Sequence, residues 1–161
     1  MEVLVSDLKG DPAAIDIVID ARPDVFNHNL ETVARLQRAV RPSAGYARSL
    51  SVLARAKAAG LTTKSGIIVG MGETDDEVRA TLADLAGVGV DIVTIGQYLR
   101  PTTHHLPVHR WVTPGQFEAY ARHGRELGIG HVESSPLTRS SYHARQAAGS
   151  TAPAPQATTA G

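Results

Sequence analysis

The sequence predicts an α/β protein built as a partial (β/α) TIM-type barrel, with about five parallel strands, outer helices and an incomplete wall. Short apolar runs rich in β-branched residues alternate with longer amphipathic stretches, which is typical of βα units on a parallel sheet. A closed barrel of eight strands takes about 200 residues or more, whereas this chain has 161. The first strand begins at the initiating methionine, so we expect its edge to be uncovered.

The five expected strands are continuous apolar runs, as in strands that are buried on both faces. They span residues 2–5, 24–27, 63–69, 91–95 and 131–133. The expected helices span residues 12–21, 32–40, 49–59, 75–86 and 114–127. Doubly wound sheets alternate in the same way, but the first strand is not followed by their Gly-x-Gly-x-x-Gly turn. The pattern therefore favours a barrel wall.

Capping residues mark the starts of three of these helices. Asp11 precedes a proline, which combines a helix N-cap with the residue that best tolerates the first helical position. Thr74 with Glu77 and Thr113 with Gln116 have the spacing of capping boxes, in which each side chain satisfies an amide of the first turn.

Composition excludes several classes of function. Sixteen basic and sixteen acidic residues balance, so the chain has no basic field that would bind nucleic acid. No apolar run is long enough for a membrane helix and the start is not a signal peptide, so we expect a cytoplasmic protein without membrane contact. Cysteine is absent, which excludes disulfides and, within this chain, an iron–sulfur cluster held by thiolates. We expect one domain over residues 1–144 and a disordered tail over residues 145–161, which is small, polar and proline-containing.

Polar residues follow each expected strand, at the end where the loops of a barrel converge. They form the stretches 6–9, 27–32, 70–74, 96–102 and 136–142, to which 64–66 at the start of the third strand are added. Each stretch also has a simpler interpretation. Residues 27–29 suit a turn, 70–73 suit a strand-to-helix turn, and His104, His105 and His109 suit a solvated loop better than a metal site. Tyr98 and Trp111 are expected to be packing residues.

Four motifs in succession resemble lipoyl synthase, a member of the radical S-adenosylmethionine superfamily. They are Asn-His-Asn-Leu-Glu-Thr (27–32), Lys-Ser-Gly-Ile-Ile-Val-Gly-Met-Gly-Glu-Thr (64–74), Thr-Ile-Gly-Gln-Tyr-Leu-Arg-Pro-Thr (94–102) and Arg-Ser-Ser-Tyr-His-Ala (139–144). The resemblance covers residues 1–144 in order, and it identifies the chain with the carboxyl-terminal half of the family only.

The resemblance implies a specific chemistry. Lipoyl synthases insert two sulfur atoms, at C6 and C8, into an octanoyl group carried on a lipoyl-domain protein. One [4Fe–4S] cluster cleaves S-adenosylmethionine to a deoxyadenosyl radical, and a second supplies sulfur. By resemblance, the residues expected at the cofactor are Asn27, Asn29, Glu31, Lys64, Ser65, Gly70, Gly72, Glu73, Gln97, Tyr98 and Leu99. Ser141, ahead of Ser140, is expected to ligate the auxiliary cluster, and no side chain is assigned a catalytic role.

The chain also departs from the family pattern. The cysteine triads that hold both clusters are absent, and Ser135 and Thr138 stand where glycine and an aliphatic residue are expected. We therefore expect the isolated chain to be inactive and to fold poorly, with a missing amino-terminal half as a partner. A non-catalytic partial barrel that binds an adenosyl ligand or a partner chain is the alternative. A different TIM-type enzyme with fortuitous motifs is a third interpretation, which the four motifs in order disfavour.

Overall fold

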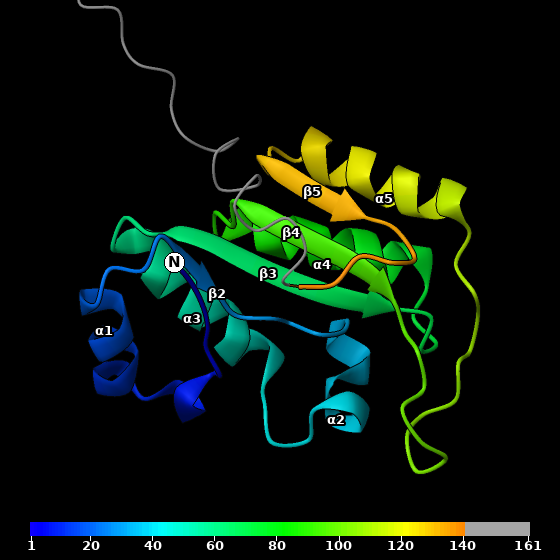
Figure 1. The fold of residues 1–161 in the computed structure, drawn as a ribbon, viewed down its shortest axis with the longest axis horizontal. Helices are drawn as coiled ribbons and strands as arrows, with labels where there is room; N and C mark the ends of the chain where they lie inside the picture. The colour runs from blue at the N-terminus through cyan, green and yellow to red at the C-terminus, as the bar shows by residue number, and fades with distance from the viewer. Residues whose placement is uncertain (141–161) are drawn as a thin grey trace, which may run out of the picture.

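A computed structural model describes residues 1–140, and its five strands form one open parallel sheet in the order β1-β2-β3-β4-β5 (Figure 1). The strands are β1 (Glu2–Leu4), β2 (Val25–Asn27), β3 (Thr62–Val69), β4 (Ile92–Gln97) and β5 (His131–Ser134). All five predicted strands are confirmed at nearly the predicted bounds. Within residues 1–140 no strand pairs with the outer edge of β1 or of β5, so the predicted incomplete barrel is also confirmed.

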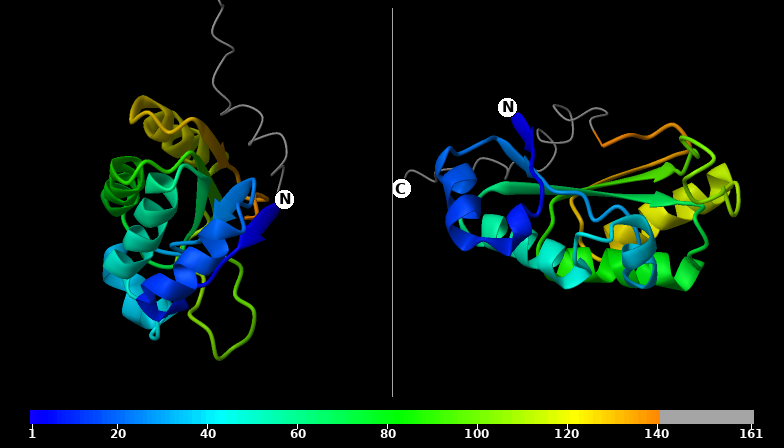
Figure 2. Two further views of the ribbon diagram at one scale, coloured as in Figure 1. Left: turned by 90° about the vertical axis from the view of Figure 1, so that its left-hand side faces the viewer. Right: turned by 90° about the horizontal axis from the view of Figure 1, so that it is seen from below.

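The helices cover one face of the sheet and leave the other open (Figure 2). They are α1 (Pro12–Asp20), α2 (Gln37–Val40), α3 (Tyr46–Ala58), α4 (Asp75–Gly87) and α5 (Pro114–Glu126), with short 3₁₀ turns η1 (Leu8–Gly10) and η2 (Ala34–Leu36). Each strand pairs with the one before it, and right-handed crossovers then place every helix on the same side. A doubly wound sheet would have helices on both faces, so the structure is a barrel wall.

The helix predicted over residues 32–40 is present over residues 34–40, but it begins two residues late and as a 3₁₀ turn that continues into one turn of α-helix. Glu31 adopts a left-handed backbone conformation (φ 68°), and regular helix is limited to η2 and the single turn of α2. Side chains bind carbonyl groups at and just before the predicted start of this helix. The Gln37 amide donates to the carbonyls of Leu30 and Thr32 at 2.8 and 3.0 Å, and the Arg41 guanidinium also donates to the Leu30 carbonyl. These local side-chain bonds occupy the chain just before the helix, which therefore begins later than its pattern predicts.

Two of the three predicted helix caps are confirmed in full. The Asp11 side chain accepts from the Ala13 amide, and Thr74 and Glu77 form a complete capping box at the start of α4. The third is confirmed in part, because the Thr113 hydroxyl accepts from the amide of Gln116, but the described part of the chain shows no reciprocal bond.

The core lies between the helices and the covered face of the sheet. Its main cluster joins β3, β4 and β5 to α3, α4 and α5, and includes Leu53, Ile67, Leu82, Ile95 and Tyr120. A smaller cluster packs α1 and α3 against β2. The open face differs in character, because it carries the polar side chains of Asn27, Lys64 and Thr94 together with Gly66 of β3 and Gly96 of β4. Within residues 1–140 no helix is long and apolar enough to cross a membrane.

Candidate functional site

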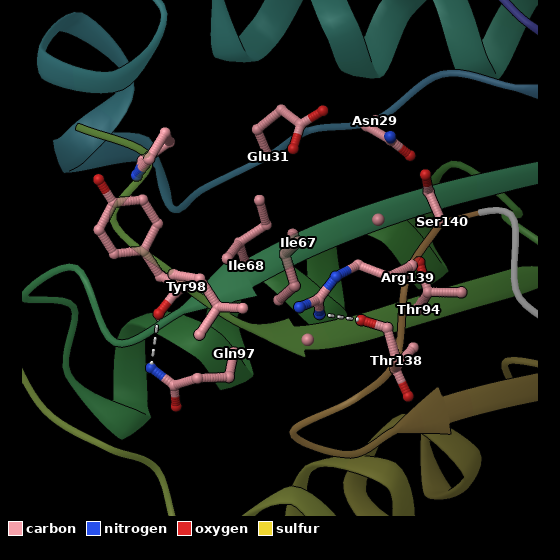
Figure 3. A pocket seen from close by; sticks show the side chains of 14 residues that line it. Asn29, Glu31, Ile67, Ile68, Thr94, Gln97, Tyr98, Thr138, Arg139 and Ser140 are labelled. Carbon is pink, nitrogen blue, oxygen red and sulfur yellow. Dashed lines mark hydrogen bonds between the residues drawn. The ribbon is translucent and has the colours of Figure 1, made fainter. Parts of the chain in front are cut away.

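A cavity of about 350 Å³ lies on the open face of the sheet, over the carboxyl-terminal parts of β3 and β4 (Figure 3). Its floor is made by small or aliphatic residues of these strands, namely Gly66, Ile68, Thr94 and Gly96. Its walls come from three segments that follow strands, residues 29–31, 97–101 and 138–140. Loops after parallel strands meet at one end of a barrel, which is where such proteins bind small molecules.

One wall of the cavity presents a buried polar atom with unused hydrogen-bonding capacity. The Asn29 Oδ1 atom is shielded from solvent and has no hydrogen-bond partner within residues 1–140. It lies close to Gly66, because a Cβ at that glycine would stand only 2.9 Å from it and 2.8 Å from the Thr94 hydroxyl. Buried polar atoms are nearly always satisfied in native proteins. A hydrogen-bond donor of a ligand would satisfy this one.

Two charged side chains of opposite sign line the cavity. Arg139 reaches in from the segment after β5, beside Thr138 in Figure 3, and forms no ion pair within residues 1–140. Its Nη1 donates to the Thr138 carbonyl at 2.7 Å. Glu31 lines another part of the cavity, where burial raises the pKa of its carboxyl group and Asn29 partly offsets that effect. The cavity therefore offers a cation and an anion to a ligand.

Asn27 and Lys64 lie on the same face of the sheet as the cavity. Lys64 stands two residues before Gly66 along β3, and Asn27 pairs with it from β2. The Lys64 side chain is fully buried, and its amine lies 3.1 and 3.2 Å from the two carboxylate oxygens of Glu2. The Asn27 amide donates to the same carboxylate at 2.8 Å. Ser65 faces the helices instead, and its hydroxyl accepts from the Leu30 amide at 3.2 Å. Ser65 thus supports the segment that carries Asn29 and Glu31, whereas Asn27 and Lys64 hold Glu2 of β1, and none of the three lines the cavity.

The turn after β3 is closed by its own residues. The buried Glu73 carboxylate accepts from the amides of Gly70 and Met71 at 2.6 and 3.0 Å. Gly70 has a positive φ of 104°, and a Cβ there would stand 2.6 Å from the Arg110 carbonyl oxygen. Gly72 faces the ring of His109. Gly70, Gly72 and Glu73 are thus outside the cavity lining, and Gly70 makes room for another part of the chain.

The residues after β4 both line the cavity and hold the long loop that follows. The Gln97 amide donates to the carbonyls of Tyr98 and Arg110, each at 3.1 Å, and accepts from the Val112 amide at 2.9 Å. The Tyr98 hydroxyl donates to the Leu106 carbonyl at 2.7 Å, while Leu99 is about half exposed. Gln97 therefore joins the start of the loop to its end, and Tyr98 holds the middle of the loop beside the cavity.

The predicted cluster ligand Ser141 lies outside the described residues, whereas Ser140 lines the cavity. Within residues 1–140 no group of three His, Cys, Asp or Glu side chains could hold a metal ion. The expectation that Trp111 is a packing residue is wrong, because 68% of its surface is exposed at the end of a loop.

The structure brings five of the eleven predicted cofactor residues to the cavity: Asn29, Glu31, Gln97, Tyr98 and Leu99. The cofactor role of all eleven stays a prediction. The sequence did not single out Thr94, Gly96, Thr138 or Arg139 as cofactor residues, although the last three lie in the polar stretches 96–102 and 136–142. Thr94, Gly96 and Arg139 stood within the motifs, but their position depends on the register between β3 and β4 and on the path of the chain after β5.

Comparisons with known proteins identify relatives of the chain. The model of the radical SAM superfamily matches residues 1–85, which is more than half of the chain. The lipoyl synthase of Rubrobacter xylanophilus is 59% identical over 148 residues, covering 91% of this chain and 46% of that protein. Those of Chlorobium limicola and Mycobacterium avium are 56% and 53% identical, covering 91% and 92% of this chain and 50% of each protein. The chain spans about half the length of the curated relatives it matches.

Proposed function

The chain belongs to the radical SAM superfamily, and from this premise we propose that it is the carboxyl-terminal half of a lipoyl synthase barrel that binds S-adenosylmethionine. The observation that carries the proposal is the similarity to lipoyl synthases over about nine-tenths of the chain. The reaction would be the insertion of sulfur at C6 and C8 of an octanoyl group on a lipoyl-domain protein, in the cytoplasm.

The cavity fits the polar end of S-adenosylmethionine, which carries an ammonium and a carboxylate group. Glu31 would accept hydrogen bonds from the ammonium group, and Arg139 would bind the carboxylate. The orphaned Asn29 oxygen would accept from a hydroxyl or amine of the ligand. Gly66 of the floor lets a ligand lie close to the backbone of β3. When bound, S-adenosylmethionine supplies the hydrogen-abstracting chemistry of the superfamily.

The residues of this chain do not fit an iron–sulfur cluster. The sequence has no cysteine, and one serine oxygen cannot hold four irons. The thiolates must therefore come from another polypeptide segment, which we propose is an amino-terminal half that pairs with the free edge of β1. The isolated chain is expected to bind the ligand without turning it over.

Calorimetric titration of the 161-residue chain with S-adenosylmethionine tests the ligand. Arg139→Gln and Glu31→Gln should each weaken binding about tenfold, since a hydrogen bond to a charged group contributes about 1.5–3 kcal/mol. Binding of 5′-deoxyadenosine, which has no amino-acid group, should not change in either variant. Arg79→Gln is the matched control, because Arg79 lies on the exposed face of α4 and pairs with Asp76. Absence of S-adenosylmethionine binding, or equal affinities in all variants, would contradict the proposed ligand.

Anaerobic reconstitution with iron and sulfide tests whether the cluster ligands come from a second polypeptide segment. The chain alone should give no four-iron absorbance, whereas a mixture with a separately produced amino-terminal half should recover sulfur insertion into an octanoylated lipoyl domain. A monodisperse chain that binds the adenosyl ligand but never restores activity would favour the alternative function, a non-catalytic binding module.

A further inference from the structure

The segment after β5 folds back across the open face of the sheet and brings its last described residues to the cavity (Figures 1 and 3). The Thr138 carbonyl oxygen lies directly over Gly96 of β4, so close that a Cβ at Gly96 would overlap it. Thr138 is 4% exposed, although it belongs to a loop. The contact is therefore a packed one between backbone and backbone, and it is possible only because residue 96 has no side chain.

Two hydroxyl groups hold the same segment in a turn. Ser135 Oγ and Thr138 Oγ1 lie 2.8 Å apart, and the Thr138 amide donates to the Ser135 carbonyl at 3.2 Å. The Ser135 amide donates in turn to the Ile95 carbonyl of β4, also at 3.2 Å. The turn is thus attached to β4 at one end through a ladder-type hydrogen bond and at the other through the Gly96 contact.

The cavity residues that follow depend on this attachment. Arg139 Nη1 donates to the Thr138 carbonyl that rests on Gly96, so the carbonyl orients the guanidinium group. Ser140 lines the cavity directly after it. A shift of Thr138 would move both of these side chains along the cavity wall.

We propose that Gly96 and the Ser135–Thr138 hydroxyl pair are positioning residues that set where Arg139 and Ser140 stand at the cavity. The inference rests on the proposed function only for the identity of the ligand. A methyl group at residue 96 would push the Thr138 carbonyl away by about 1 Å to reach ordinary van der Waals distance. Displacements of this size at a binding group lower activity by up to about a hundredfold.

Amide hydrogen exchange of the full chain, read by NMR, tests the positioning role without any ligand. Gly96→Ala should speed the exchange of the Thr138 amide at least about fivefold, the factor that one hydrogen bond contributes, and should leave the amides between β3 and β4 unchanged. Gly87→Ala is the matched control, because a Cβ at that glycine has no atom within 4 Å. Equal exchange of the Thr138 amide in the two variants would overturn the proposal.

Ser135→Ala and Thr138→Val test the positioning role if Gly96→Ala speeds exchange throughout the sheet. Each should raise the exchange rate of the Thr138 amide by a similar factor. The double variant should raise this rate no further than either single variant, since both remove the same hydroxyl–hydroxyl bond. No effect of either variant, or fully additive effects, would overturn the proposal. Weakened S-adenosylmethionine binding in Gly96→Ala is also expected. A chain that shows the predicted exchange but binds no S-adenosylmethionine would contradict the proposed function and leave the positioning role intact.

Discussion

Glu2→Gln should strongly destabilise the chain, because it leaves the buried Lys64 ammonium without a counter-charge. The Lys64 side chain has no exposed surface, the Glu2 side chain is 17% exposed, and the shorter of their two N–O distances is 3.1 Å. Removing one partner of a buried ion pair costs about 3–5 kcal/mol. Because the pair lies at the solvent-facing side of the sheet and Gln keeps an acceptor for the Asn27 amide, we expect the lower figure, about 3 kcal/mol.

A double variant separates the loss of the pair from the loss of packing. Glu2→Leu combined with Lys64→Met replaces both charges by apolar side chains, and should recover most of the stability that Glu2→Gln loses. Asp76→Asn is the control for an exposed pair, because its carboxylate is 92% exposed and lies 3.1 Å from Arg79. That variant should change the free energy of unfolding by less than about 0.5 kcal/mol.

Urea denaturation followed by circular dichroism measures these differences. Domains of this size have free energies of unfolding of about 5–15 kcal/mol, and we expect this chain, with its open sheet, at the lower end, so a loss of about 3 kcal/mol moves the midpoint clearly. The reasoning would be refuted if Glu2→Gln and Asp76→Asn shifted the midpoint equally, since Lys64 would then have water or another partner. It would also be refuted if the double variant were less stable than Glu2→Gln.

Three further substitutions test the interactions that shape the site. Burial lowers the pKa of His28, so the unfolded chain takes up a proton first on acidification. The free energy of unfolding should therefore fall by up to about 1.4 kcal/mol per pH unit below about pH 6.5, and urea titrations of His28→Gln should lack this slope. Gly70→Ala should lower the free energy of unfolding by at least about 2 kcal/mol, because φ at residue 70 is +104° and the Arg110 carbonyl occupies the space that a Cβ would need. In the same thermal melts Gly115→Ala should be neutral or stabilising, because a Cβ there would have no atom of the described residues within 4 Å. Thr74→Ala removes a complete capping box and should cost about 1–2 kcal/mol, an outcome that Thr74→Ser should largely avoid.

The fold was predictable where the local sequence pattern and the tertiary packing favour the same secondary structure. The strands are continuous apolar runs bounded by polar loops. This pattern alone predicts that the side of each strand that faces the helices is buried. The segment over residues 32–40 has an equally helical pattern, yet its helix begins only at Ala34 and as a 3₁₀ turn. The Gln37 amide binds the carbonyls of Leu30 and Thr32 at the predicted start of the helix. Helix propensity does not describe such side-chain bonds, so it could not reveal the late start.

The site was predictable to the extent that its residues directly follow strands. Asn29, Glu31 and Gln97 were expected at the mouth and lie there, because parallel strands end on one side of the sheet. Lys64 was expected at the ligand, but it lies two residues before Gly66 along β3, outside the cavity, and its amine pairs with the Glu2 carboxylate. Ser135 and Thr138 stood out only as departures from a family pattern. The structure shows that these two side chains bond to each other.

The glycines show why a motif does not by itself define a ligand site. A missing Cβ admits a ligand or a neighbouring backbone carbonyl for the same steric reason, so the sequence does not distinguish the two. In this fold Gly70 admits the Arg110 carbonyl and Gly96 admits the Thr138 carbonyl, whereas Gly66 is approached by the side-chain oxygens of Asn29 and Thr94. Backbone carbonyls attached to packed turns cannot leave, but side-chain oxygens can rotate toward a ligand. Close approach of the ligand to the sheet is therefore expected at Gly66, and the other two glycines act by holding the loops that surround it.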